Sequence, residues 1–101
     1  MELEINVTNL TKEDIINILN EGFKSLIWNK NNVLEITNKL LNNENVTIIN
    51  FRNVKFSMSL YRLYRGVELF IKNGGSTKTC KYNVFECDNI IQYALFGEII
   101  Y

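Results

Sequence analysis

The 101-residue chain contains no histidine and no proline, and it has only two cysteines, Cys80 and Cys87. Without histidine, a Ser-His-Asp triad, a Cys-His pair and a histidine-ligated metal site are all impossible. Two cysteines supply neither a disulfide framework nor a four-cysteine zinc site. We therefore expect no metal and no cofactor, and we interpret Cys87 as a small core residue of a helix.

The chain also has no net charge, because its eleven basic and eleven acidic residues cancel, and its isoelectric point is near 6.2. This balance argues against a general nucleic-acid binder, which needs net positive charge. A hydrophobic content of 47% is enough for one core, so we predict a single domain over residues 1–101. The first residues, MELEINV, carry no basic segment typical of a signal peptide, and we expect a cytoplasmic protein without membrane contact.

Most of the secondary-structure signals in the sequence are those of helices. The stretch 60–73 has apolar residues on one face of a 3.6-residue period, with Ser59 as its cap and Gly74 after its end. Thr11 predicts the start of a helix over 12–24, in which Gly22 permits close packing. Capping pairs predict a helix at 84–96 from Asn83 and a short one at 33–42.

Strand signals are shorter. Alternation predicts a strand at 2–8, and a hairpin of strands 46–51 and 54–58 that turns at 52–53. Residues 77–82 and 98–101 are further strand candidates, while 25–31 can close a helix or form a strand. The resulting fold class is α+β, with three main helices packed on a small, mostly antiparallel sheet in two layers.

The carboxylates that could catalyse a reaction form two pairs, Glu13 with Asp14 and Glu86 with Asp88. Each pair falls in the first turns of a predicted helix, where negative side chains stabilise the positive end of the helix dipole. We interpret them as capping and dipole residues and predict that the protein is not an enzyme.

The outer face of helix 60–73 is the first candidate binding site. Arg62, Arg65 and Lys72 surround Leu69 on this face, with Tyr61 beside them. A solvated face is the simpler interpretation. The alternative is a basic patch with an apolar centre, suited to an acidic protein surface, a phosphate-bearing ligand or nucleic acid.

Two further candidates are apolar. The second face of helix 84–96, with Phe85, Asn89, Tyr93 and Phe96, is either sandwiched inside the domain or forms an interface, for example of a homodimer. Trp28, the only tryptophan, lies in a polar context and is either a core residue or an exposed binding anchor.

A family resemblance rests on three stretches of the chain: LTKEDIINILNEGFKSLIWN (10–29), LYRLYRGVELFIKNGG (60–75) and DNIIQYALFGEIIY (88–101). Together they resemble a family of small uncharacterised phage and prophage proteins of Firmicutes and gut bacteria. The last stretch, with its QYALFGEIVY-like pattern, is the most specific. Ile27 and Asn29 depart from the family, which usually has an aromatic residue and a cysteine there.

The resemblance implies a phage accessory protein. The leading hypothesis is a non-enzymatic protein that occludes a host factor, as an inhibitor of a bacterial defence system does. The alternative is a protein that sequesters a nucleotide signal in a pocket at a subunit interface, using Arg62, Arg65 and aromatic rings.

Overall fold

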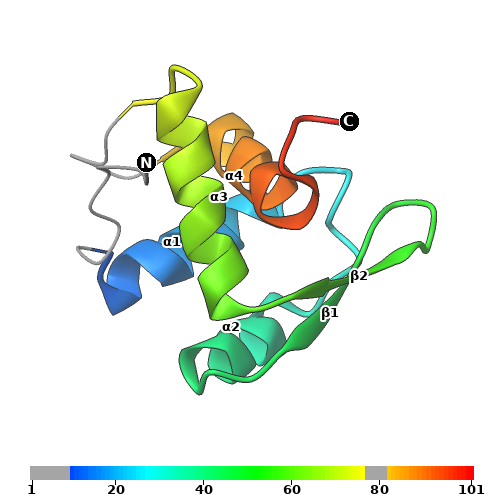
Figure 1. The fold of residues 1–101 in the computed structure, drawn as a ribbon. Helices are drawn as coiled ribbons and strands as arrows, with labels where there is room; N and C mark the ends of the chain where they lie inside the picture. Colours follow the sequence, from blue (N-terminus) through cyan, green and yellow to red (C-terminus); the bar gives the residue numbers. More distant parts are fainter. Residues whose placement is uncertain (1–9, 77–81) are drawn as a thin grey trace.

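The computed structural model describes residues 10–76 and 82–101, and these have an α+β fold. The helices are α1 (Lys12–Gly22), α2 (Val33–Leu41), α3 (Leu60–Lys72) and α4 (Val84–Phe96). Two strands, β1 (Val46–Ile49) and β2 (Lys55–Met58), form an antiparallel hairpin. In Figure 1 the hairpin projects to the right from the group of helices. The predicted fold class is confirmed.

Local hydrogen bonds explain where the helices begin. The Thr11 hydroxyl accepts from the Asp14 backbone N–H at 3.1 Å, and the Asp14 carboxylate accepts from the Thr11 N–H at 3.0 Å. Asn83 and Glu86 form the same reciprocal capping box on α4. Ser59 caps α3 through the Arg62 N–H. These predicted starts are confirmed, because caps satisfy N–H groups that the helix itself leaves unpaired.

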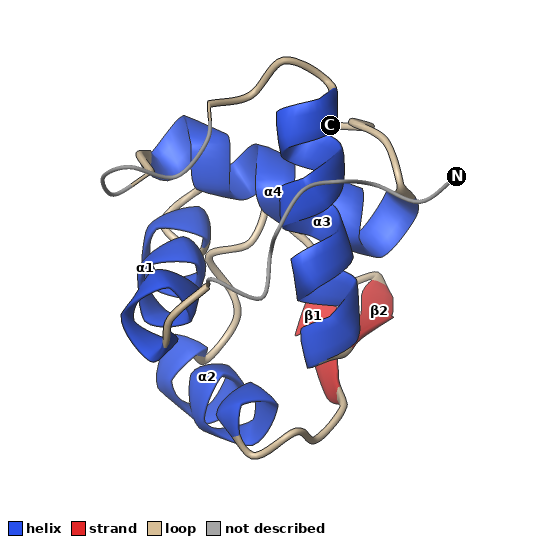
Figure 2. Ribbon diagram, turned by 60° about the vertical axis from the view of Figure 1, so that its left-hand side comes forward, coloured by secondary structure: helices blue, strands red, loops and turns tan. Residues whose placement is uncertain are grey.

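Helix α4 lies at the centre of the packing, in contact with both α1 and α3 (Figure 2). Its residues Cys87, Ile90 and Ile91 are fully buried. The core interpretation of Cys87 is thus confirmed. Burial, with smaller contributions from the carboxylates of Glu21 and Glu86, raises the pKa of Cys87 to about 12. The thiol therefore stays protonated at neutral pH.

The hairpin pairs Val46 with Met58 and Ile49 with Lys55 at its two ends. Its inner face is buried at Val46, Ile48 and Met58, while the opposite face is largely exposed. At the tip, the side-chain oxygen of Asn50 accepts from two backbone N–H groups of the turn. Asn50 thus closes the turn with its side chain and fixes the loop that follows β1.

Several predicted boundaries and strands differ. Helix α1 ends at Gly22 instead of residue 24, and residues 23–30 form turns, neither helix nor strand. Residues 98–101 are not a strand, and Tyr82, the last residue of the predicted strand 77–82, is not in one. The predicted strand 2–8 and the rest of 77–82 lie outside the described residues. Within the described ranges, no helix is long and apolar enough to cross a membrane.

Candidate functional site

Trp28 is a core residue, with no exposed surface. Its ring packs against Phe56, Phe96 and Tyr101, with ring centroids 6.2–6.4 Å apart. Its indole Nε1–H donates to Asp88 Oδ1 at 2.6 Å. The binding-anchor alternative for Trp28 is therefore wrong, because a partner cannot reach a side chain that the protein itself covers.

Asp88 is the buried acceptor of this region, with 9% of its surface exposed. It accepts from Trp28 and from Gln92 Nε2, which lies 3.3 Å from Oδ1. Burial raises the pKa of the Asp88 carboxyl, while the two hydrogen bonds oppose that shift. The dipole interpretation of Asp88 is wrong. The signal that could have revealed its role is the i, i+4 spacing of Asp88 and Gln92 on an otherwise apolar face.

Gln92, which is fully buried, holds the C-terminal tail. Its Oε1 accepts from the backbone N–H of Ile100 at 2.8 Å and of Tyr101 at 2.7 Å. The Tyr101 hydroxyl in turn accepts from Asn50 Nδ2 at 2.8 Å. Side-chain amides thus take the place of the strand pairing predicted for residues 98–101, and they join the tail to the hairpin tip.

Replacing Gln92 with leucine is expected to release the tail. Leucine has a similar volume but no acceptor, so the N–H groups of Ile100 and Tyr101 lose their partner. We expect the amides of residues 100 and 101 to exchange with deuterium at least about tenfold faster, while the core amides of α3 remain protected. The protected amides of α3 are the internal control. Equal exchange in wild type and Gln92→Leu contradicts this role of Gln92.

Tail and hairpin tip together expose an apolar area that we call the tip–tail surface. It consists of Phe51 (41% exposed), Val54 (47%), Ile99 (43%), Ile100 (53%) and Tyr101 (41%). The rings of Phe51 and Tyr101 are in contact, with centroids 5.7 Å apart. The sequence analysis missed this surface because its two parts are about fifty positions apart in the chain.

Cations border the tip–tail surface. The Arg52 guanidinium lies 5.1 Å from the centre of the Phe51 ring. Lys30 Nζ donates to the Phe51 carbonyl at 3.1 Å and to Asn53 Oδ1 at 3.0 Å. Lys55 is exposed at the start of β2. The surface therefore combines apolar side chains with positive charge.

The predicted basic face of α3 is only partly formed. Tyr61, Arg62 and Lys72 are exposed, but Leu69, its predicted apolar centre, is half-buried. Arg65 pairs with Glu68 at 2.7 Å, which neutralises its charge locally. Glu68 lies one turn from Arg65 on the same face. The exposed charge of this face is thus smaller than the sequence analysis predicted.

The residues of the predicted interface on α4 are exposed to different degrees. Phe85 is 70% exposed, whereas Asn89 and Tyr93 are only partly exposed. Phe96 packs edge-to-face on Phe56, with centroids 4.9 Å apart, and also contacts Trp28. Phe96 is therefore part of the intramolecular aromatic cluster. Because Phe96 is also partly exposed, its assignment to an interface stays a prediction.

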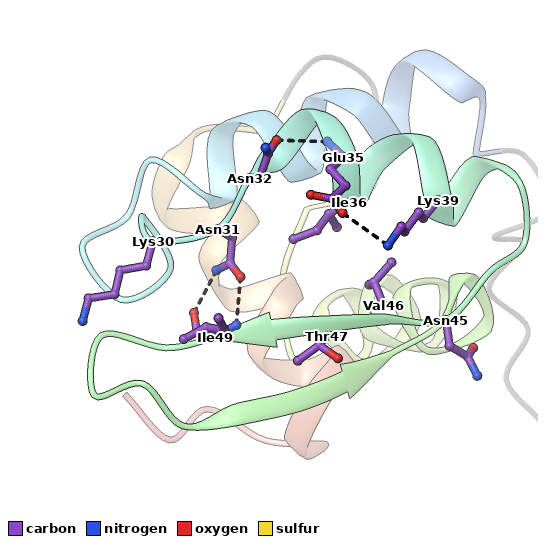
Figure 3. A pocket seen from close by; sticks show the side chains of 10 residues that line it. All are labelled: Lys30, Asn31, Asn32, Glu35, Ile36, Lys39, Asn45, Val46, Thr47 and Ile49. Carbon is purple, nitrogen blue, oxygen red and sulfur yellow. Dashed lines mark hydrogen bonds and ion pairs between the residues drawn. The ribbon is translucent and has the colours of Figure 1, made fainter.

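A pocket of about 370 Å³ lies between α2 and β1 (Figure 3). Lys30, Glu35 and Lys39 contribute charges to its lining, and Glu35 pairs with Lys39 at 3.3 Å. Arg62 and Arg65 do not line it. Among the residues that the structure describes, no group of three or more cysteine, aspartate or glutamate side chains is placed to hold a metal ion.

Comparisons with protein-family models, with curated proteins and with solved structures return no match to this chain.

Proposed function

We propose that this chain is a non-enzymatic binding protein, encoded by a phage and acting in the host cytoplasm, that occludes a host protein and thereby inhibits a defence system. The phage and defence parts of this proposal rest on the sequence resemblance. The contact itself is assigned to the tip–tail surface. The observation that carries this assignment is a set of five apolar residues, each more than 40% exposed, on two segments. These segments meet at the contact of the Phe51 and Tyr101 rings and at the hydrogen bond of Asn50 with Tyr101.

Rigidity is what makes exposed apolar area useful for binding. Ordering a flexible loop on association consumes binding free energy, whereas a surface that is already ordered avoids this loss. The tail is held by two hydrogen bonds to Gln92, and the tip is held by two to Asn50. The aromatic rings of Phe51 and Tyr101 then present apolar area with few rotatable bonds.

The charges indicate the kind of partner. Lys30 and Arg52 contact Phe51 of this surface, and the tail contributes one side-chain carboxylate, Glu98. Aromatic residues and arginine are the side chains that most often dominate binding energy. We therefore infer a partner with an apolar centre and acidic side chains around it.

A pull-down from host lysate with matched variants tests the assignment. Arg52→Glu and Ile100→Glu alter exposed positions of the tip–tail surface and leave the core intact. We expect both to reduce capture of a stoichiometric host protein at least about tenfold, with an unchanged melting temperature. The double variant Arg62→Glu/Arg65→Glu tests the other predicted site, on α3, and it is expected to retain capture.

The opposite result, loss of capture only with Arg62→Glu and Arg65→Glu, would move the contact to α3. Retention by every variant overturns the surface assignment. If no host protein is captured, the binding-protein proposal fails and the nucleotide-sequestering alternative is next. A thermal shift with cyclic dinucleotides tests that alternative, because a ligand that binds the folded state raises the melting temperature.

A further inference from the structure

The groove between α2 and β1 contains one unused edge of the sheet. The register pairs Ile48 with Phe56, and the Asn50 N–H donates to the Val54 carbonyl at 3.0 Å. Antiparallel strands alternate hydrogen-bonded and non-hydrogen-bonded pairs. The backbone groups of Val46 and Ile48 therefore face β2, and those of Thr47 and Ile49 face the groove.

At Ile49 this edge already has a substitute partner. Asn31 Nδ2 donates to the Ile49 carbonyl at 2.8 Å, and the Ile49 N–H donates to Asn31 Oδ1 at 2.8 Å. A neighbouring strand would make the same two-bond exchange. Figure 3 shows Asn31 reaching β1 from the loop before α2. The Asn31 side chain thus occupies the position of a neighbouring strand, and it makes the two hydrogen bonds with the Ile49 backbone that such a strand would make.

Thr47 lies two residues along the same edge and is exposed. Within residues 10–76 and 82–101, its outward N–H and carbonyl have no hydrogen-bond partner. Thr47 and Asn45 both line the groove, whose volume of about 370 Å³ separates them from Glu35 and Lys39 of α2 (Figure 3). An unpaired edge with space beside it is a template for strand addition.

We propose that this groove binds an extended peptide segment of a partner protein, which adds to β1 as a third strand at Thr47. Main-chain hydrogen bonds hold the segment, as in other cases of strand addition. At a rise of about 3.3 Å per residue, the open edge from Asn45 to Thr47 accommodates roughly three residues.

A lysine that can bind an acidic segment lines the groove. Lys30 and Lys39 both belong to the lining, together with Glu35. The Lys30 ammonium donates to the Phe51 carbonyl and to Asn53 Oδ1 at the hairpin tip, so Lys39 is the cation that remains for a segment in the groove. A glutamate or aspartate in the segment could pair with Lys39 in place of Glu35, because both members of that pair are about half exposed. This proposal does not rest on the tip–tail surface, with which the groove shares only Lys30.

Selection from a displayed library of random heptapeptides tests the proposal. We expect the recovered peptides to be proline-free and to contain an acidic residue. Each is resynthesised with single N-methyl groups along its backbone. Methylation of the amide opposite Thr47 is expected to weaken binding at least about tenfold. The largest amide chemical-shift changes in the protein are expected at residues 45–47.

Two variants at the groove and two controls elsewhere test the contact further. Thr47→Pro removes the outward N–H without removing a bond of the hairpin and is expected to abolish peptide binding. Lys39→Glu is expected to weaken binding of acidic peptides. Lys72→Glu, the same charge change at the end of α3 far from the hairpin, and Arg52→Glu on the tip–tail surface are expected to have no effect.

Three outcomes overturn the proposal: recovery of no peptide, equal binding of all N-methylated forms, or amide shift changes that are largest outside the residues lining the groove. A fourth is dimerisation of the free protein with the same amides protected, which would assign the edge to a second copy of this chain.

Discussion

Replacing Gly66 with alanine is expected to destabilise the protein by about 2 kcal/mol. A Cβ at this position would lie 2.6 Å from the Ile90 carbonyl oxygen and 2.8 Å from the Ala94 Cβ. Both atoms belong to α4, and the nearest is backbone, so α3 and α4 must separate to make room. Overpacking of a core costs roughly 3 kcal/mol at its upper range. The higher helix propensity of alanine offsets up to about 1 kcal/mol of this destabilisation.

Gly22→Ala is the matched control. There the added Cβ would first meet Cδ1 of Ile91, the far end of a side chain, while the nearest backbone atom, the carbonyl carbon of Cys87, is 3.4 Å away. We expect a destabilisation smaller than that of Gly66→Ala by at least about 1 kcal/mol. The free energy of unfolding of both glycine variants is measured by urea unfolding, followed by the fluorescence of Trp28, the only tryptophan. Equal effects at the two glycines would contradict the backbone clash at Gly66.

Replacing Asp88 with alanine is the second change with a large expected effect. It leaves the indole N–H of Trp28 without its acceptor in a buried site. It also takes one acceptor from Gln92 Nε2, which keeps the Tyr101 carbonyl at 3.4 Å. Each unsatisfied donor costs about 1–3 kcal/mol, and loss of the buried carboxylate returns part of this. We expect a net loss of about 2–3 kcal/mol at neutral pH in the same urea titration. Asp88→Asn keeps an acceptor for Trp28 and should lose less.

The stability of the wild type relative to Asp88→Asn is expected to depend on pH. Burial raises the pKa of Asp88 in the folded state above its ordinary value of 3.8, so the folded protein holds this proton more tightly than the unfolded chain. The resulting stabilisation is fully present below the ordinary pKa and is lost as the pH rises through the folded-state pKa. Asparagine cannot titrate, so the difference should favour wild type more at about pH 3 than at pH 7. A constant difference would mean that Asp88 does not titrate with a raised pKa.

The starts of the helices were predictable because their signals are local. Thr11, Ser59 and Asn83 satisfy N–H groups only three residues away, so a short window of sequence contains both the donor and the acceptor. The positive φ angles of Gly74 and Gly97 were predictable for a similar reason, because a helix commonly ends with a glycine in the left-handed conformation directly after it. The hairpin was predictable from alternation, although Asn50 shortens both strands by closing the turn with its side chain.

The candidate surfaces were less predictable. Helical periodicity correctly placed Arg62 and Tyr61 on an exposed face of α3, but it left out the pairing of Arg65 with Glu68, which depends on rotamers. Two apolar sides of α4 were visible in the sequence. Whether its second side met solvent or other elements of the same chain depended on where the hairpin lies.

By itself, the sequence determined the fold class, the helix starts and the hairpin, since caps and periodicity act between residues a few positions apart. Only the tertiary structure decided that Trp28 is buried against Asp88, sixty residues later, and that Gln92 holds the tail. These contacts join segments whose separation along the chain gives no local signal. In the sequence, a polar side chain in an apolar stretch does not identify its hydrogen-bond partner. The fold decides which group becomes the partner, because it places the two groups within hydrogen-bond distance and excludes water from both.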